Sequence, residues 1–321
     1  MTAGRPDVRL GGMAEAGVAP APTPAELLAP RPALAARRRV LVTGASGMLA
    51  RDLVPVLAGA GCEVFARPRS DLDITSEAEV SLAFREVRPE VTVNCAAFTR
   101  VDACETDARA REVNAGGVRL LADACRRHGS QLVHISTDFV FAGDKNTPYL
   151  EGDRTGPLSA YGRGKLEGEE AALSVPTGLV IRASWLFGRG GQNFVEAILA
   201  QVEGGRRDLS VVTDQRGRPT ATTDLSEAIL ALLEAGAVGI YHFANRGEVS
   251  WLEFAEDILM LSGHGDVKVA ATTAEALSRP ARRPAYSVLA TDKFEAVTGR
   301  AIRHYREPLI EYLAVRAEPE L

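Results

Sequence analysis

The feature that most constrains the fold is a regular alternation of short apolar runs with helical segments between residues 38 and 184. The apolar runs predict buried strands at 38–44, 62–67, 91–97, 131–137 and 178–184. Helical spacing or capping signals fill the intervals, with one long helix predicted at about 105–128. Parallel strands need such crossover connections, and the helices then cover both faces of the sheet. The sequence therefore predicts an α/β fold with a doubly wound parallel sheet of the Rossmann type, whose ligands bind outside the carboxyl ends of the strands.

Beyond residue 185 the alternation loosens, which predicts a second and smaller α/β lobe. Helices are predicted near 191–203, near 223–235 and from Trp251, with strands at 209–214 and 239–244. We therefore divide the chain into a disordered tail, a Rossmann domain and a mainly substrate-binding lobe, some of whose segments return to the main sheet; their ranges are 1–37, 38–185 and 186–321.

The composition excludes several other classes of protein. The formal net charge of -5 carries no basic footprint for nucleic acid, and no apolar run approaches the ~20 residues of a membrane span. The tail is rich in Ala, Pro and Gly and lacks the long apolar region of a signal peptide. No metal site is predicted, because the cysteines form no CxxC pair or Cys/His cluster; they are Cys62, Cys95, Cys104 and Cys125. Unpaired cysteines of this kind favour a cytoplasmic protein with reduced, packed thiols.

The stretch "GASGMLA" follows the first predicted strand and opens the first helix. Gly44 and Gly47 fit the first two glycines of a dinucleotide-binding loop, and Ala50 stands where the third is usual. The first glycine permits the tight turn, and the second lets the backbone approach a pyrophosphate at the positive end of the helix. The loop therefore predicts a dinucleotide cofactor.

The residues after the second strand bear on the choice of cofactor. An acidic residue there binds the ribose 2′-hydroxyl of NADH, whereas arginines favour the 2′-phosphate of NADPH. Arg67 and Arg69 come first, and Asp71 and Asp73 come later. This order favours NADPH, with NADH and a merely solvated charged loop left open.

Three residues on consecutive elements suggest proton chemistry. Thr137 ends the fourth strand, and Tyr161 and Lys165 lie four positions apart on the next helix, so they share one face. An ammonium group near a phenol is expected to lower its pKa, which makes Tyr161 a candidate proton donor, with Thr137 as a hydrogen-bond donor to a carbonyl oxygen. Asp138 is expected to hold a substrate hydroxyl or to cap a turn. A surface pair is the alternative for Tyr161 and Lys165, but their combination with the glycine loop favours catalysis.

Arg282 and Arg283 are candidates for binding a diphosphate, since guanidinium groups grip phosphate oxygens in a fork. A basic surface loop before Pro284 is the alternative interpretation.

With these motifs in view, the chain resembles the extended short-chain dehydrogenase/reductases, and in particular the dTDP-4-dehydrorhamnose reductase family. The resemblance rests on eight segments in the family's order between residue 38 and about 295: "NCAAFTRVDACE", "STDFVFAG", "PLSAYGRGKLEGE", "IRASWLFG", "NFVEAIL", "VVTDQRGRPT", "GIYHFAN" and "ARRPAYSVL". It implies reduction of the C4 ketone of dTDP-4-dehydro-β-L-rhamnose to dTDP-β-L-rhamnose by NADPH or NADH, and it is compatible with a homodimer.

The resemblance also implies roles for single residues. Tyr161 would be the proton donor and Lys165 its partner, which also binds the cofactor. The substrate would be met by Thr137, Asp138, Trp185 and Asn193. The cofactor would be lined, besides Gly44 and Gly47, by Met48, Leu49, Asp73, Ile74, Ala96, Ala97 and Thr99.

Some positions depart from the family's pattern, and two other functions stay open. Ala50 replaces a glycine, Phe139 a tyrosine, and Pro68 an acid that many members carry after the second strand, which leaves the cofactor preference unsettled. One alternative is a related dTDP-4-keto-6-deoxysugar reductase or dTDP-dihydrostreptose synthase of an antibiotic pathway. The other is a non-catalytic regulatory homologue, such as the regulatory subunit of methionine adenosyltransferase.

Overall fold

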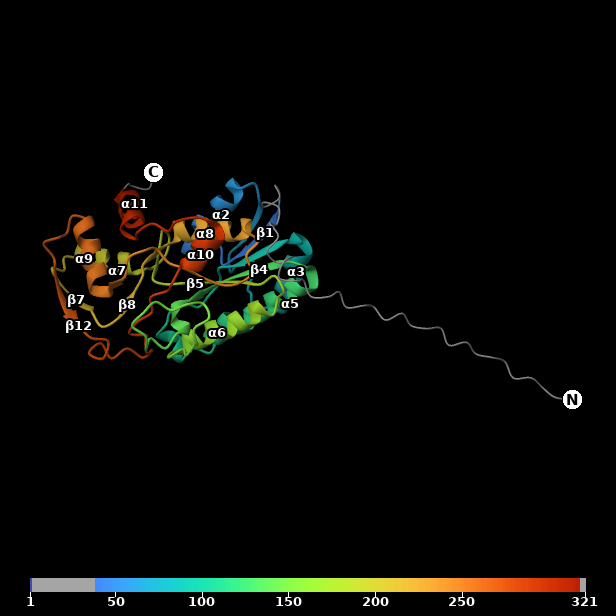
Figure 1. The fold of residues 1–321 in the computed structure, drawn as a ribbon, viewed down its shortest axis with the longest axis horizontal. Helices are drawn as coiled ribbons and strands as arrows, with labels where there is room; N and C mark the ends of the chain where they lie inside the picture. The colour runs from blue at the N-terminus through green and yellow to red at the C-terminus, as the bar shows by residue number, and fades with distance from the viewer. Residues whose placement is uncertain (2–37, 318–321) are drawn as a thin grey trace. The chain divides into compact units, whose positions relative to one another are not determined.

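The computed structural model describes residues 38–317 and, apart from these, only Met1, so the predicted tail lies outside the described residues. Six parallel strands form one sheet in the order β10-β5-β4-β3-β1-β2 (Figure 1). The first five strands agree closely with the predicted runs, and the doubly wound α/β fold is confirmed. The bounds are β1 Arg39–Thr43, β2 Glu63–Arg67, β3 Val91–Asn94, β4 Gln131–Thr137, β5 Leu179–Ala183 and β10 Gly239–Phe243.

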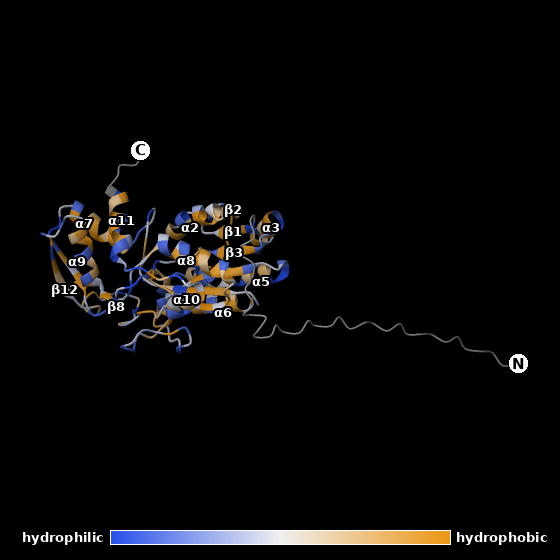
Figure 2. Ribbon diagram, turned by 45° about the horizontal axis from the view of Figure 1, so that its top comes forward, coloured by the Kyte–Doolittle hydropathy of each residue, from blue (hydrophilic) through white to orange (hydrophobic). Residues whose placement is uncertain are grey.

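Helices cover both faces of this sheet because successive strand side chains point in opposite directions. Val40 and Val42 pack on the face of α2, α8 and α10, whereas Leu41 packs on the face of α3, α5 and α6. Figure 2 shows the central strands mostly in the apolar colour. These helices are α2 Met48–Gly59, α3 Glu77–Val87, α5 Val118–His128, α6 Ala160–Leu173, α8 Thr222–Glu234 and α10 Asp292–Thr298. Three elements from beyond residue 186 thus return to the main domain: β10 joins the sheet, and α8 and α10 pack on one face of it.

A separate apolar core holds the smaller lobe together. It joins α7, α9 and α11 to β7, with Phe254 and Ile258 buried at its centre, and Figure 1 shows α7 and α9 beside β7 and β12. The lobe has three two-stranded ladders: β7 with β12, β8 with β11, and β6 with β9. The bounds are β6 Leu186–Phe187, α7 Phe194–Glu203, β7 Asp208–Val212, β8 Arg216–Gly217, β9 Thr220–Ala221, β11 Val249–Ser250, α9 Trp251–Leu261, β12 Lys268–Thr272 and α11 Arg306–Ala317.

The prediction of one regular helix at 105–128 is wrong, because the segment is divided into several helical pieces. The segment consists of a 3₁₀ turn (Ala103–Glu105), a short α4 (Arg109–Arg111), a π-helical stretch (Glu112–Gly117) and α5. A Cβ at Gly117 would lie 2.7 Å from the Ile74 side chain, so this chain segment passes unusually close to the end of the β2–α3 loop. A wider π turn at such a crowded place changes the direction of the helix.

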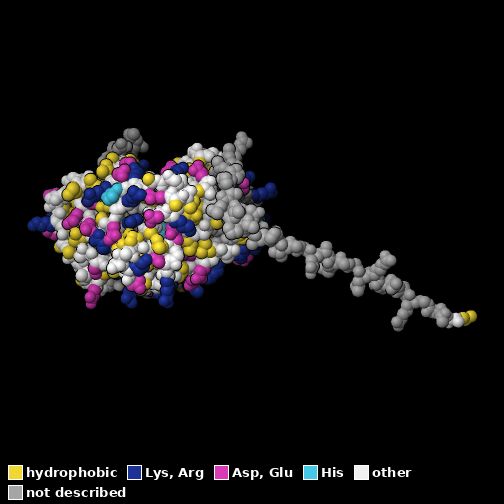
Figure 3. Space-filling model, viewed as in Figure 1, with side chains coloured by type: hydrophobic (Ala, Val, Ile, Leu, Met, Phe, Trp, Pro, Cys, Tyr) yellow, Lys and Arg dark blue, Asp and Glu magenta, His cyan; other side chains and the backbone are white. Residues whose placement is uncertain are grey.

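The surface fits an ordinary globular domain. Basic and acidic side chains are intermixed on the face seen in Figure 3. Among the described helices, none combines the length and the apolar character that crossing a bilayer requires. Nor do the described residues gather three His, Cys, Asp or Glu side chains in a way that would hold a metal ion.

A buried ion pair fixes α6 to the sheet. The Glu169 carboxylate on α6 accepts hydrogen bonds from Arg182 Nε (2.9 Å) and Nη2 (2.7 Å) on β5, and from Ser136 Oγ (2.5 Å) on β4. The two ionic side chains are 2% and 3% exposed. Since α6 also carries Tyr161 and Lys165, this pair sets where both residues stand.

Breaking the pair from one side should be costly. We expect Arg182→Met to lower the free energy of unfolding by roughly 3–5 kcal/mol, because the Glu169 carboxylate then remains buried and unpaired. The double variant Arg182→Met/Glu169→Met should recover most of the loss, since neither partner is then left buried without the other. Urea denaturation of the three proteins measures both effects. Equal losses in the single and double variants would contradict the account.

Candidate active site

The predicted cofactor loop lies at the carboxyl end of β1. Gly44 has φ 65°, and a Cβ there would lie 2.6 Å from the backbone nitrogen of Ala96, so the β1 and β3 loops touch at a point that only glycine permits. The Gly47 N–H donates to the Gly44 carbonyl (2.9 Å), and α2 begins directly after it at Met48. The free N–H groups at this helix start suit the negative charge of a pyrophosphate, as predicted from the sequence.

The residues predicted to bind the adenosine half of the cofactor already have partners within the protein. The Asp73 carboxylate accepts hydrogen bonds from Thr75 N (2.9 Å) and Oγ1 (2.7 Å), which lower its pKa, and Arg69 pairs with it at 3.3 Å. Arg67 lies 3.8 Å from Glu86. Ile74 is 3% exposed and belongs to the core beneath α3 and α5. Ile74 is therefore a core residue, and Asp73 organises the turn that follows it.

The β3 loop, which carries the predicted Ala96, Ala97 and Thr99, is held by two asparagines that the sequence did not single out. Asn94 Oδ1 accepts from Thr43 Oγ1 (2.6 Å) and from Ala96 N (3.2 Å). Asn114, in the π-helical stretch, accepts from Phe98 N (2.8 Å) and donates to Phe98 O (2.9 Å). Both asparagines are 1% exposed, so this loop is fixed by interior side chains.

Lys165 projects from α6 towards the carboxyl end of β4. Its ammonium donates to the Ile135 carbonyl (2.6 Å) and lies 3.3 Å from His134 Nε2. Its burial lowers its pKa to about 8, which the nearby Glu169 carboxylate partly opposes. Burial also lowers the pKa of His134 well below its usual value, so this imidazole is neutral beside the ammonium.

The expected lowering of the Tyr161 pKa by Lys165 is wrong for this structure. Burial raises that pKa above its ordinary value, and the negative charge of Asp138 raises it further, while a hydrogen bond with Thr137 opposes both. Lys165 is not among the groups that shift this pKa, and its ammonium donates to the Ile135 carbonyl. Tyr161 is thus a fully protonated phenol at neutral pH, which suits a proton donor.

Thr137 and Asp138 form a tight turn at the end of β4. Thr137 Oγ1 accepts from Phe139 N (3.2 Å) and donates to Asp138 Oδ1 (2.9 Å). Asp138 is 1% exposed, and its Oδ2 has no hydrogen-bond partner among the described residues. Burial raises the pKa of this carboxyl to about 6. An unpaired acceptor of this kind can receive a hydrogen bond from a ligand hydroxyl.

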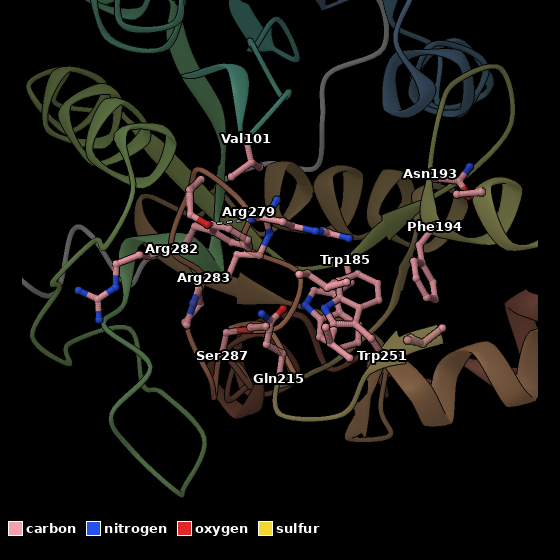
Figure 4. Close-up of a pocket in the computed structure, with 18 of the residues that line it drawn as sticks. Val101, Trp185, Asn193, Phe194, Gln215, Trp251, Arg279, Arg282, Arg283 and Ser287 are labelled. Atoms are coloured by element: carbon pink, nitrogen blue, oxygen red, sulfur yellow. Dashed lines mark hydrogen bonds between the residues drawn. The ribbon is translucent and has the colours of Figure 1, made fainter. Parts of the chain in front are cut away.

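A cavity of about 860 Å³ adjoins the turn that Thr137 and Asp138 form (Figure 4). Phe139, whose ring meets Tyr161 edge-on at 5.6 Å, lines it. Five of the predicted residues lie in its wall: Thr99, Trp185, Asn193, Arg282 and Arg283. The wall also holds residues that were not predicted, among them Arg100, Phe194, Gln215, Trp251 and Arg279. The cavity therefore offers aromatic faces and several guanidinium groups, the chemistry that a nucleoside diphosphate requires.

Two predicted substrate residues already have structural partners. Arg283 forms a two-pronged ion pair with Asp102 (3.0 Å for each contact), which ties the β3 loop to the segment before Pro284. Asn193 caps α7, accepting from Glu196 N (3.1 Å) and donating to Gly188 O (3.0 Å). Arg282 is exposed. Of the two arginines, Arg282 is thus the better placed to meet a phosphate.

The missed residues left few signals in the sequence. Trp251 lies 66 positions after Trp185 in a helix that also reads as ordinary core, and its place in the cavity wall depends on long-range packing. Arg279 was within reach of sequence reasoning, because it belongs to the same basic run as Arg282 and Arg283.

The chain is similar to known proteins over most of its length. The family model described as "RmlD substrate binding domain" matches residues 38–317. A dTDP-4-dehydrorhamnose reductase from Streptomyces griseus is 45% identical over 283 residues, covering 86% of this chain and 93% of that protein. A probable dTDP-4,6-dihydroxy-2-methyloxan-3-one 4-ketoreductase from Streptomyces antibioticus is also 45% identical, covering 85% and 94%. The crystal structure of dTDP-4-dehydrorhamnose reductase from Bacillus anthracis in complex with NADP has a TM-score of 0.82 at 33% identity, covering 87% of this chain and 99% of that one.

The parallel sheet, the glycine loop and the Tyr161–Lys165 helix define a Rossmann-type protein of the short-chain dehydrogenase/reductase kind. Together with the extent of these matches, they show that the chain belongs to the dTDP-4-dehydrorhamnose reductase family.

The buried carboxyl of Asp138 leads to a prediction about stability. Its folded pKa of about 6 exceeds the unfolded value of 3.8, so its contribution to stability is fully present below about pH 4 and is lost as the pH rises through 6. Asp138→Asn removes this loss. We expect the variant to gain roughly 1–3 kcal/mol over the wild type at neutral pH and little near pH 4.

Urea denaturation at the two pH values measures the difference. Asp266→Asn, at an exposed position, is the control and should change neither value. A gain for Asp138→Asn that is the same at both pH values would show that this carboxyl titrates normally.

Proposed function

We propose that this protein reduces the C4 ketone of dTDP-4-dehydro-β-L-rhamnose to dTDP-β-L-rhamnose with NADPH. The observation that carries the proposal is that Tyr161 meets Thr137, with Lys165 one helical turn further along α6. Phe139, whose ring contacts Tyr161, lines the cavity that is rich in arginine and aromatic side chains. The names of the S. griseus and B. anthracis relatives support the substrate, and the NADP in the B. anthracis structure supports the cofactor. NADH stays open, because Arg67 and Arg69 both have acidic partners.

The residues present fit the cofactor. Gly44 brings the β1 loop against Ala96, and the start of α2 offers N–H groups to a pyrophosphate. When bound, NADPH supplies the hydride that reduces the ketone carbon. Lys165, with its ammonium at the end of β4, would bind the nicotinamide ribose hydroxyls.

The protein's own part in the reaction is proton transfer and charge stabilisation. Negative charge develops on the ketone oxygen as the carbon is reduced. Tyr161 donates its phenol proton to that oxygen. The Thr137 hydroxyl, which donates to Asp138 Oδ1 in the free protein, turns to donate its hydrogen bond to the ketone oxygen instead. Asp138 Oδ2 accepts from a sugar hydroxyl, which supplies the partner that this buried oxygen lacks.

A related ketosugar reductase is the second candidate. The S. antibioticus 4-ketoreductase is as similar to this chain as the S. griseus protein, so similarity alone does not choose the product. A regulatory homologue is disfavoured, because the three predicted catalytic side chains are all present. We also propose that the enzyme works in the cytoplasm with its four cysteines as free thiols, and as a homodimer.

The first test is the loss of reduced-nicotinamide absorbance with enzymatically made dTDP-4-dehydrorhamnose, with the product identified by NMR. dTDP-L-rhamnose as product supports the proposal, and another dTDP-sugar moves the protein to the second candidate. No oxidation of either NADPH or NADH by the folded protein would contradict a reductase.

Replacing the proton donor should separate chemistry from binding. We expect Tyr161→Phe to lose at least about 100-fold in kcat, because general acid catalysis contributes on that order. The Kd of NADPH, measured by fluorescence titration, should stay within about threefold, since the phenol oxygen is a minor part of the cofactor site. Full activity in this variant would remove Tyr161 from the mechanism.

The arginines should separate substrate binding from cofactor binding. We expect Arg282→Ala to raise the KM of the dTDP-sugar about tenfold, because a charge-assisted contact to phosphate is lost. Arg283→Ala should also raise it, since the tie to Asp102 is broken as well. The KM of NADPH should not change in either variant. Arg127→Ala, an exposed position at the far end of α5, is the control. Unchanged substrate KM in both test variants would refute the diphosphate role.

A further inference from the structure

The two tryptophans of this chain lie stacked on each other in the cavity wall. The ring centroids of Trp185 and Trp251 are 3.5 Å apart, and the ring planes differ by 6°. Figure 4 shows the two indoles one over the other beside the arginine segment. Trp185 follows β5 closely, whereas Trp251 opens α9 in the smaller lobe. The stack therefore joins the two halves of the site.

The backbone of Trp185 is in an unfavourable conformation. Its φ is 50°, and among the other described non-glycine residues only Arg88 and Ser278 have a positive φ. A bulky side chain in this left-handed region costs free energy and persists only where its surroundings hold it. Strain of this kind is concentrated at functional sites.

The Trp185 indole is held by the two-stranded ladder of β8 and β11. A Cβ on Gly217 would lie 2.5 Å from the Trp185 ring, so the ring packs directly against the β8 backbone. Gly217 pairs with Val249 on β11, and Trp251 comes directly after that strand. Trp251 is thus attached to the same ladder against which the Trp185 ring rests.

The start of α9 is itself rigid. Ser250 and Glu253 form a reciprocal capping box at this helix end. Glu253 also pairs with Arg216 on β8 at 3.2 Å. These contacts fix the direction in which the Trp251 ring leaves the helix.

We propose that Trp251 is a positioning residue for the reduction, which acts by holding Trp185 in its left-handed conformation against the ketosugar. This inference rests on the proposed function and on the family resemblance, which implies that Trp185 meets the substrate. A face-to-face contact with a fixed ring restricts Trp185 to one orientation before substrate binds. The ketone then meets Tyr161 and Thr137 in a single pose, and small displacements from such a pose are costly in rate.

The stack can be tested without substrate. In protein labelled with 5-fluorotryptophan, fluorine NMR should show two resonances, which Trp185→Phe and Trp251→Phe assign. The Trp251 ring current should shift the Trp185 resonance away from that of free fluorotryptophan. Trp251→Leu should remove this shift, and Trp251→Phe should retain part of it. A Trp185 resonance that is the same in all three proteins would refute the stack.

Kinetics then test the function of the stack. With the dTDP-ketosugar, we expect Trp251→Leu to lower kcat/KM about tenfold and Trp251→Phe to stay within about threefold, while the Kd of NADPH and the thermal midpoint change little. Gly217→Ala should resemble Trp251→Leu, because its methyl group displaces the Trp185 ring. Gly265→Ala, where an added Cβ meets nothing within 4 Å, is the matched control.

A double-mutant cycle separates positioning from direct contact with substrate. If Trp251 acts through Trp185, the Trp251→Leu change should alter kcat/KM less than about twofold in a Trp185→Ala background. Additive effects would mean that Trp251 touches the substrate itself and would overturn the inference, as would full activity of Trp251→Leu in an active wild type. A wild type that oxidises no NADPH with any dTDP-ketosugar would instead refute the proposed function, and this inference with it.

Discussion

The contact on which the catalytic arrangement depends is the hydrogen bond from the buried Lys165 ammonium to the Ile135 carbonyl, 2.6 Å long. It fixes the middle of α6 to the carboxyl end of β4. Tyr161 precedes Lys165 by four residues and Glu169 follows it by four, so the three lie along one face of the helix. Because Glu169 is paired with Arg182 on β5, the helix is fixed at a second point along that face. The positions of Tyr161, Lys165 and Glu169 relative to the sheet are therefore fixed.

Burial explains the charge states along this face. It lowers the pKa of Lys165 to about 8, keeps His134 neutral and raises the pKa of both Tyr161 and Asp138. The site thus contains a protonated phenol, an ammonium that is costly to keep charged, and a carboxyl with one unpartnered oxygen. In the proposed reaction, the Tyr161 phenol and the unpartnered Asp138 oxygen each meet a group of the ketosugar.

The sequence predicted what depends on local pattern. The strands agree because buried parallel strands are short apolar runs bounded by turns, and the glycine loop agrees because Gly44 occupies a conformation that other residues avoid. The regular helix at 105–128 failed because close packing of Gly117 on Ile74 overrides helical spacing. The predicted effect of Lys165 on the pKa of Tyr161 is wrong because sequence spacing shows which side chains share a face, but not how deeply the phenol is buried or that Asp138 lies near it.

By itself, the sequence determined the strands of the parallel sheet, the glycine loop, the set of Thr137, Tyr161 and Lys165, and the family. Only the tertiary structure decided that Arg283 pairs with Asp102 and that Trp251 stacks on Trp185. The physical reason is range. Propensities and turn chemistry act over a few neighbouring residues, whereas the partner of an ion pair or an aromatic ring is chosen by the packing of elements that are distant in the chain.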